Sequence, residues 1–111
     1  MKLKFKEKQG LIPAIIQDYS SKEILMLGYM NNKSFEKTVQ TGWVYFWSRF
    51  RKQIWMKGET SGNKLKVKEI YTDCDKDSLL IKVDLVGSNV CHTGNKNCFY
   101  TNLSIEDYES K

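Results

Sequence analysis

The residues best able to carry chemistry in this 111-residue chain are concentrated between positions 73 and 98. This window holds every cysteine of the chain and its only histidine, together with three aspartates that alternate around the first cysteine. Thiolate and imidazole groups are the ligands that zinc prefers, whereas carboxylate oxygens suit Mg²⁺ and Ca²⁺. The window therefore indicates two metals of different character. Its chemistry-bearing residues are Asp73, Cys74, Asp75, Asp77, Cys91, His92 and Cys98.

The three cysteines supply one thiolate fewer than the four ligands of a typical structural zinc site. Three sulfurs leave a position for water, which is the arrangement of a catalytic zinc that lowers the pKa of that water to roughly 7. Neighbouring side chains of an extended chain point apart, so His92 is a candidate for proton transfer rather than a fellow ligand of Cys91. It remains open that the cysteines are small buried hydrophobes that never meet, and that the histidine is structural.

The aspartates at 73, 75 and 77 have a spacing of two, which in an extended chain directs all three carboxylates to one face. Three like charges on one face repel unless a cation neutralises them, so the pattern favours Mg²⁺ or Ca²⁺. A calcium-binding EF-hand is rejected, because Ser78 stands where that loop needs glycine and Asp84 where it needs glutamate. An acidic turn that leads into the next strand remains an alternative.

Length and composition predict a single globular domain over residues 1–111, with 41% hydrophobic and 28% charged residues. The N-terminal residues lack the apolar core of a signal peptide, and no apolar run is long enough to span a membrane. An odd number of cysteines without secretory features argues for reduced thiols and a cytoplasmic protein. The net charge of +5 suggests an anionic partner without choosing its class.

The elements that must position this window are mostly strands. Apolar runs at 11–17 and 24–27 flank turn residues and predict a β-hairpin. Strand 64–68 carries lysines on its outer face and slips in phase at 69–70, which allows a bulge. Residues 1–10 are expected to form an arm or an edge strand, and residues 101–111 a loose tail. The other strands are predicted at 43–48, 54–56 and 79–86.

One short helix is expected between the hairpin and the next strand, from residue 33 to about 41. Asn31 or Asn32 can cap its start, and Gly42 would close it at its C-terminal end. The resulting fold class is α+β and mostly β. The buried stripe of the helix is expected to consist of Phe35 and Val39.

The most specific motifs are Asp-Cys-Asp-x-Asp at 73–77 and Cys-His-Thr-Gly-x-x-x-Cys-Phe at 91–99. In their order and spacing, these and several shorter motifs closely resemble the phosphoribosyl-AMP cyclohydrolase family of histidine biosynthesis. The likeness runs from about Gly10 to Phe99. The shorter matching segments include Leu-Ile-Pro-Ala at 11–14, Tyr-Met-Asn at 29–31, Trp-Ser-Arg at 47–49, Trp-x-Lys-Gly-Glu-Thr-Ser-Gly-Asn at 55–63 and Val-Lys-Glu-Ile at 67–70.

This resemblance implies an enzyme with two metals. Cys74, Cys91 and Cys98 match the family's zinc ligands, the first from one subunit and the others from its partner. The three aspartates match its magnesium ligands. The resemblance also implies a small, barrel-like antiparallel domain with one short helix, which forms a homodimer with metal sites at the interface. No nucleic-acid or membrane partner is implied.

The reaction implied by the resemblance is hydrolytic opening of the purine ring of 1-(5-phosphoribosyl)-AMP between N1 and C6, the third step of histidine biosynthesis. Zinc-activated water would attack C6 while His92 moves a proton, giving the phosphoribosyl-formimino-AICAR ribotide. Because the chain ends soon after Cys98, a stand-alone enzyme is expected, without the pyrophosphatase domain fused to some relatives. Candidates for binding the two phosphates of the substrate are Arg49, Arg51, Lys57, Ser61, Gly62 and Asn63.

A zinc-stabilised basic nucleic-acid-binding module without catalysis is the alternative function. The positive net charge and the lysine-faced strand at 64–68 are compatible with an OB-like binder, and the phosphate-binding candidates equally fit a solvated basic face. Three aspartates beside the metal would repel a phosphate backbone, however, and a structural zinc needs four ligands within reach.

Overall fold

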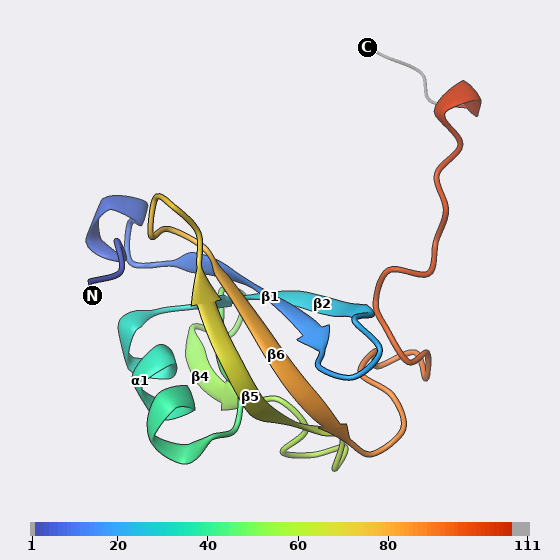
Figure 1. Ribbon diagram of the computed structural model, residues 1–111, viewed down its shortest axis with the longest axis horizontal. Coiled ribbons are helices and arrows are strands. Elements are labelled where there is room, and N and C mark those ends of the chain that lie inside the picture. The colour runs from blue at the N-terminus through green and yellow to red at the C-terminus, as the bar shows by residue number, and fades with distance from the viewer. Residues whose placement is uncertain (1, 108–111) are drawn as a thin grey trace.

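The computed structural model describes residues 2–107 and shows a mostly β fold with one α-helix at the side of the strands (Figure 1). The 3-10 turns η1 and η2 lie near the two ends of this range. In chain order the elements are η1 (Lys6–Lys8), β1 (Ile12–Asp18), β2 (Ile24–Met30), α1 (Asn32–Thr41), β3 (Tyr45–Ser48), β4 (Gln53–Met56), β5 (Lys64–Thr72), β6 (Leu79–Val86) and η2 (Ile105–Asp107).

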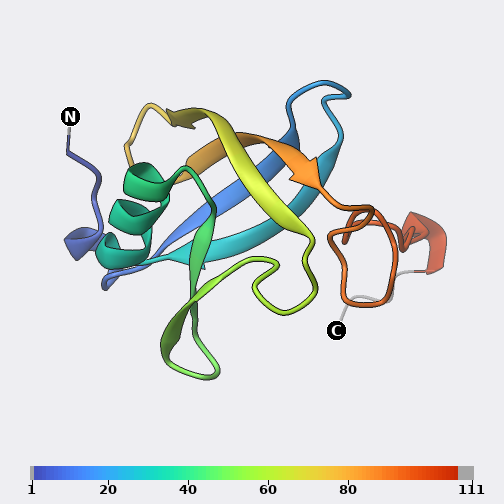
Figure 2. The same ribbon diagram turned by 90° about the horizontal axis from the view of Figure 1, so that it is seen from below.

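Four strands form one open sheet in the order β2-β1-β6-β5, and β3 and β4 form a separate hairpin. The β1 strand is antiparallel to β2 but parallel to β6, and β6 is antiparallel to β5. The predicted barrel-like antiparallel sheet was therefore wrong. A parallel pair requires a long connection, and the chain between β1 and β6 includes α1 and the β3–β4 hairpin. This hairpin projects from the large sheet and does not close it into a barrel (Figure 2).

The core lies on one face of the large sheet because its strands alternate between buried and exposed side chains. On β6, Leu79, Ile81 and Val83 are buried, as the predicted strand over 79–86 requires. The β5 strand shifts its register between Val67 and Glu69, just before the phase slip at 69–70 that allowed a bulge. The predicted hairpin of β1 and β2 is also confirmed.

The helix begins at a capping box. The Asn31 side chain accepts the Ser34 backbone N–H at 2.8 Å, and the Ser34 hydroxyl accepts the Asn31 N–H at 3.0 Å. Gly42 ends the helix with a left-handed φ of 79° and donates its N–H to the Thr38 carbonyl at 2.9 Å. The predicted cap at Asn31 and the predicted closing glycine are both confirmed.

The buried side of α1 differs from the prediction. Val39 is 56% exposed, whereas Ser34 and Thr38 are fully buried, and Phe35 packs at the edge of the core. Thr38 Oγ1 donates to the Ser34 carbonyl at 2.8 Å and accepts the Tyr45 N–H at 2.9 Å. Hydrogen bonds therefore stabilise a polar buried face, which an apolar periodicity does not detect.

The two ends of the described range lie far apart (Figure 1). Residues 2–10 form no strand and contain the short turn η1, while residues 101–106 are exposed and include the start of η2. Residues 108–111 of the predicted loose tail are outside the described range. Over residues 2–107, none of the helices has the length and apolar character needed to cross a membrane.

Candidate metal and substrate site

Two of the three cysteines meet in the loop that follows β6. The thiols of Cys91 and Cys98 lie close enough to affect each other's pKa, although six residues separate them in the chain. Cys91 Sγ also lies 3.0 Å from the Thr93 hydroxyl, which in turn lies 3.1 Å from the Tyr100 hydroxyl. The structure therefore places two candidate soft metal ligands near each other.

The two thiols have different proton affinities. The hydrogen bond with the Thr93 side chain lowers the pKa of Cys91, because it stabilises the thiolate. Burial raises the pKa of Cys98, and the neighbouring Cys91 thiol raises it further. Cys91 is therefore the first of the pair to ionise as pH rises, which favours its role as a metal ligand.

The cysteine loop, residues 87–98, is fastened to the β1–β2 turn. The Cys98 backbone N–H donates to the Leu25 carbonyl at 2.8 Å. Glu23 forms a 3.0 Å ion pair with Lys96 and accepts a hydrogen bond from the Asn97 side chain. Because 74 positions separate Glu23 from Asn97, no local signal in the sequence indicated this contact.

The polar loop between β4 and β5, residues 57–63, fastens the cysteine loop from the other side. Lys57 Nζ donates to the Val90 carbonyl at 2.6 Å, and the Asn63 side-chain oxygen accepts the Ser88 N–H at 3.0 Å. Gly87 is required here, because a Cβ at this position would lie 2.1 Å from that Asn63 oxygen. We call these two hydrogen bonds the Lys57–Asn63 clamp.

Lys57 is also an electrostatic neighbour of the thiol pair. Burial lowers the pKa of its ammonium group, while the nearby Cys98 and Cys91 thiols act to raise it. A half-buried ammonium beside two sulfurs favours their thiolate forms. The sequence suggested Lys57 and Asn63 as phosphate ligands, whereas the structure engages both of them with the cysteine loop.

Three of the six phosphate-binding candidates line one small cavity of about 200 Å³. They are Arg51, Lys57 and Ser61, and Gly62 follows in an exposed turn with a φ of +83°. Arg49 lies outside this cavity, with its guanidinium 4.0 Å from the centre of the Tyr29 ring. The cavity adjoins the cysteine loop through Lys57.

The three aspartates also meet, but not in the way that their spacing predicted. Residues 73–78 form a turn between β5 and β6, so the carboxylates are gathered by the turn and not by the alternation of an extended strand. Their oxygens all lie within 4.8 Å of one another, and Asp77 forms a 3.3 Å ion pair with Lys8. The grouped residues are Asp73, Asp75 and Asp77.

Asp73 holds this turn together. One of its carboxylate oxygens accepts the backbone N–H groups of Asp77 at 3.0 Å and of Ser78 at 3.2 Å. Desolvation acts to raise the pKa of Asp73, but the combined hydrogen bonds outweigh it and hold that pKa at about 2. The carboxylate is therefore charged throughout the physiological range and available to a cation.

Cys74 lies apart from the other two cysteines. It is exposed in the turn before β6, whereas Cys91 and Cys98 follow the end of that strand. Among residues 2–107, the aspartates form the only group of three or more candidate metal ligands. His92 is exposed while Cys91 beside it is buried, as expected for neighbours that point apart.

The family model and two of the relatives that match this chain carry the same description. The family model described as phosphoribosyl-AMP cyclohydrolase matches residues 26–100. The chain is 50% identical over 109 residues to a phosphoribosyl-AMP cyclohydrolase of Solibacter usitatus, covering 98% of this chain and 86% of that one. It is 59% identical over 99 residues to the enzyme of the same name from Clostridium botulinum, covering 89% of each.

A longer relative contains the same region. Over 104 residues the chain is 58% identical to the histidine biosynthesis bifunctional protein HisIE of Caldanaerobacter subterraneus, covering 94% of this chain and 50% of that protein. The matched range in the family model includes the aspartate turn, the cysteine loop and the Lys57–Asn63 clamp. The chain therefore belongs to the phosphoribosyl-AMP cyclohydrolase family.

Proposed function

We propose that this protein is a histidine-biosynthesis enzyme that hydrolyses the purine ring of 1-(5-phosphoribosyl)-AMP between N1 and C6. Membership of the phosphoribosyl-AMP cyclohydrolase family supports the substrate class. The observation that carries the chemistry is the adjacent pair of thiols, Cys91 and Cys98, in a loop held against a cavity with basic side chains. Two thiols are too few for a zinc site, so a third ligand must come from elsewhere.

The donor set fits zinc. Cys91 and Cys98 would hold the ion together with Cys74 of a second copy of the chain, leaving one position for water. Zinc bound by three thiolates lowers the pKa of that water to roughly 7 and so supplies a nucleophile at neutral pH. The Thr93 hydroxyl and the Lys57 ammonium stabilise the negative charge of the thiolates.

An apolar row across the outer face of the large sheet supports a homodimer. One side chain from each strand contributes, and the strand register places them as direct neighbours from one edge of the sheet to the other. Ile15, Leu27 and Tyr71 are 38%, 42% and 48% exposed. A continuous apolar row on a sheet face is typical of an interface. From β2 to β5, the row consists of Leu27, Ile15, Leu80 and Tyr71.

The positions of the cysteines support a two-fold arrangement across this face. Cys74 precedes β6 and Cys91 follows it, so the two parts of the site are separated by the length of that strand, roughly 25 Å for its residues. Packing the sheet faces of two copies with their strands reversed brings the start of one β6 near the end of the other. Two complete sites would then form, each with cysteines from both copies.

His92 moves the proton in this proposal. Addition of water to C6 forms the C–O bond, and the bond from C6 to N1 then breaks. The His92 imidazole accepts a proton from the attacking water and delivers one to N1 as it leaves, so the ring opens without free acid or base. His92 suits this role because it is exposed beside Cys91.

The substrate phosphates are assigned to Arg51 and to the turn at Ser61 and Gly62, with Arg49 nearby. Arginine recognises phosphate with two parallel hydrogen bonds, and the open space around Gly62 allows backbone N–H groups to approach an anion. Mg²⁺ is assigned to the carboxylates of the aspartate turn, which would lie in the same interface as Cys74.

The test compares zinc stoichiometry and turnover of phosphoribosyl-AMP in the wild type and in Cys98→Ser, with and without Mg²⁺. We expect about one zinc per chain in the wild type and loss of both zinc and turnover in the variant. Turnover by zinc-free protein would contradict the zinc assignment alone. Zinc binding without turnover would contradict the proposed activity.

The nucleic-acid-binding alternative is tested separately by filter binding over a salt series. A binder of nucleic acid makes phosphate contacts, and its affinity falls steeply as salt increases. We expect no such salt-dependent binding, because the aspartate turn places three carboxylates at the surface close to Cys74.

A further inference from the structure

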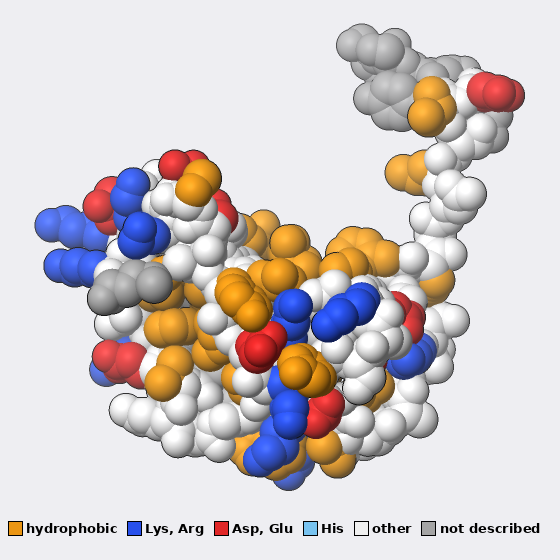
Figure 3. Space-filling view, viewed as in Figure 1, with side chains coloured by type: hydrophobic (Ala, Val, Ile, Leu, Met, Phe, Trp, Pro, Cys, Tyr) orange, Lys and Arg blue, Asp and Glu red, His pale blue; other side chains and the backbone are white. Residues whose placement is uncertain are grey.

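A C-terminal arm, residues 99–107, leaves the body of the molecule with apolar side chains uncovered. Leu103 is 84% exposed and Ile105 is 91% exposed, and Phe99 before them is 61% exposed. Figure 3 shows the arm rising from the surface with apolar groups on it and open space between it and the opposite end of the molecule. In the sequence, Glu106 follows directly and gives the arm negative charge.

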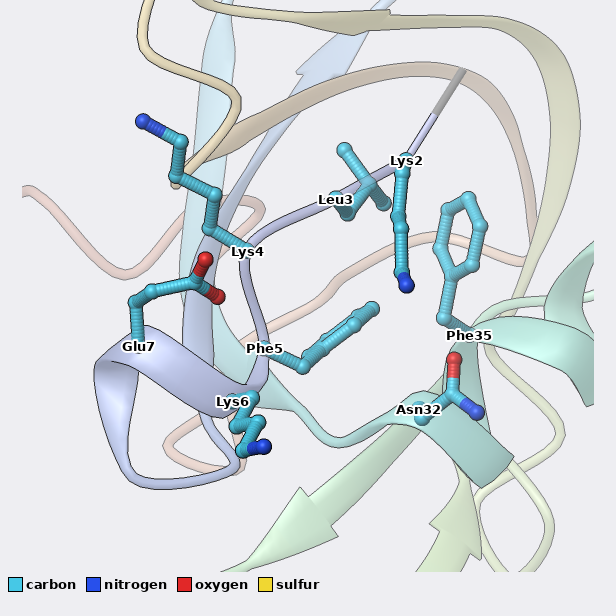
Figure 4. Close-up of a pocket in the computed structure, with 8 residues that line it drawn as sticks. All are labelled: Lys2, Leu3, Lys4, Phe5, Lys6, Glu7, Asn32 and Phe35. Carbon is cyan, nitrogen blue, oxygen red and sulfur yellow. The ribbon is translucent and has the colours of Figure 1, made fainter.

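A cavity that complements the arm in polarity and charge lies at the N-terminal end of the molecule. It has a volume of about 680 Å³ and is formed by residues 2–7 and the start of α1. Its walls include Leu3, Phe5 and Phe35, and the two rings are 6.0 Å apart between centroids (Figure 4). Its polar rim contains three lysines against one glutamate, so it is basic. The rim residues are Lys2, Lys4, Lys6, Glu7 and Asn32.

The cavity is joined to the aspartate turn, and the arm is joined to the cysteine loop. Lys4 N–H donates to the Lys76 carbonyl at 2.8 Å, and Lys8 pairs with Asp77, so residues 2–8 are fixed beside the turn that contains Cys74. The arm begins at the residue after Cys98. Any arrangement that brings Cys74 of one copy to Cys98 of another therefore also brings the arm near the cavity of the other copy.

We propose that the C-terminal arm of one copy docks in the N-terminal cavity of a second copy, with Leu103 and Ile105 against the Phe5 and Phe35 rings and Glu106 near the lysine rim. Apolar side chains meet an apolar wall, and an acidic segment meets a basic rim. The choice of a second copy as occupant rests on the shared zinc site proposed above. The match in polarity and charge does not depend on it.

The same arm does not fit the cavity of its own chain. The arm starts beyond the C-terminal end of β6, whereas the cavity lies beside the turn that precedes β6. Figure 1 shows the arm directed away from its own N-terminal segment. If two copies exchange their arms, each arm fills the N-terminal cavity of the other copy. The exchange adds two identical contacts to a two-fold dimer.

The test measures the dimer dissociation constant by sedimentation in the full-length double variant Leu103→Ser/Ile105→Ser. We expect dimerisation to weaken at least about tenfold, because two apolar side chains per arm lose their burial. Phe50→Ser is the matched control, since Phe50 is 95% exposed at the β3–β4 turn and outside the proposed contact. It should leave the dissociation constant unchanged. An unchanged constant in the double variant would overturn the arm proposal.

Charge reversal tests the cavity itself. Glu106→Lys and Lys6→Glu should each weaken the dimer a few-fold, and the chain carrying both changes should recover. Weakening by Glu106→Lys alone, without an effect of Lys6→Glu, would place the arm elsewhere and overturn the proposal.

Zinc content and turnover separate this proposal from the proposed function. Above the dissociation constant, the arm variants should keep both, because none of the changed residues belongs to the metal or substrate site. A wild type that stays monomeric while it binds zinc and turns over substrate would overturn the shared site and the arm contact together. A wild-type dimer whose dissociation constant does not change in the arm variants would overturn the arm contact only.

Discussion

Single side chains decide the proton chemistry of this molecule through the groups that they touch. Asp73 keeps a low pKa because two backbone N–H groups donate to its carboxylate, and Cys91 becomes the more acidic thiol because Thr93 bonds to its sulfur. Desolvation raises the pKa of its neighbour Cys98. The same residues are thus both candidate metal ligands and partners in structural hydrogen bonds.

The role of His92 is tested by His92→Ala. We expect kcat to fall by about 10²-fold or more, because a positioned acid–base group contributes on that scale. Zinc content should stay at the wild-type value, since His92 is exposed whereas the candidate ligand Cys91 is buried. Atomic absorption and turnover measured on the same sample check both. Unchanged kcat would remove His92 from the mechanism.

The low pKa of Asp73 predicts a defined pH dependence of stability. Its pKa is about 2 in the folded protein and 3.8 in an unperturbed chain, so the ionised group stabilises the fold fully above the higher value. That contribution is lost as pH falls through about 4 towards 2. The difference in unfolding free energy between wild type and Asp73→Asn should therefore shrink over this window.

Urea unfolding in the presence of a metal chelator measures this difference. Asp75→Asn is the matched control, because Asp75 is exposed and has no hydrogen bond in the part of the chain that the structure describes. A difference between wild type and Asp73→Asn that stays constant from pH 6 to pH 2 would show that the hydrogen bonds, and not the charge, hold the turn.

At the scale of elements, α1 is fixed to β3 by one buried hydroxyl. Thr38→Val keeps the shape of the side chain but leaves the Tyr45 N–H without its 2.9 Å acceptor. We expect a loss of about 1–3 kcal/mol in the free energy of unfolding, which is the cost of a buried unsatisfied donor. Urea denaturation measures it, and Val39→Thr on the exposed side of the helix should change little.

The Lys57–Asn63 clamp joins two loops that carry the site. Lys57→Met removes the 2.6 Å bond to Val90 and the positive charge beside the thiols, so zinc affinity should fall about 10–100-fold. Lys57→Arg should recover part of the affinity, and Lys33→Met, at an exposed position of α1, should have no effect. Competition with a chromophoric chelator measures the affinity. Equal affinities of Lys57→Met and wild type would contradict a positioning role.

Local chemistry was readable from the sequence, and distant pairing was not. Asn31 and Gly42 identify the helix ends because each acts within a few residues, and the alternation at 79–86 identifies β6. The parallel pairing of β1 with β6 joins residues more than sixty positions apart. No local pattern indicates such a pairing, and the prediction of an antiparallel barrel was therefore wrong. Likewise, Lys57 donates to the Val90 carbonyl 33 positions away, which no local pattern indicates. From its charge alone, the sequence suggested that Lys57 binds a phosphate.

The candidate site was predicted in its residues more than in its arrangement. The residue types of Asp73–Asp77 and Cys91–Cys98 identify them as candidate metal ligands in the sequence. In the fold, the aspartates lie close to one another, and Cys91 lies close to Cys98. The supporting contacts of Glu23 with Lys96 and Asn97 have no motif, because they depend on how the chain returns to the β1–β2 turn.

For the whole molecule, the decisive question is whether one active site is built from two chains. The separation of Cys74 from the Cys91–Cys98 pair and the apolar row across the sheet both point to a two-fold dimer. A site shared in this way makes activity depend on which copy carries which cysteine.

The most direct test mixes two inactive variants, Cys74→Ser and Cys98→Ser, under conditions that allow subunits to exchange. Half of the dimers become hybrids, and each hybrid has one site with all three cysteines, so turnover should recover to about a quarter of the wild-type value. Zinc should return in the same proportion. Hybrid dimers that form but remain without zinc and turnover would contradict the shared site.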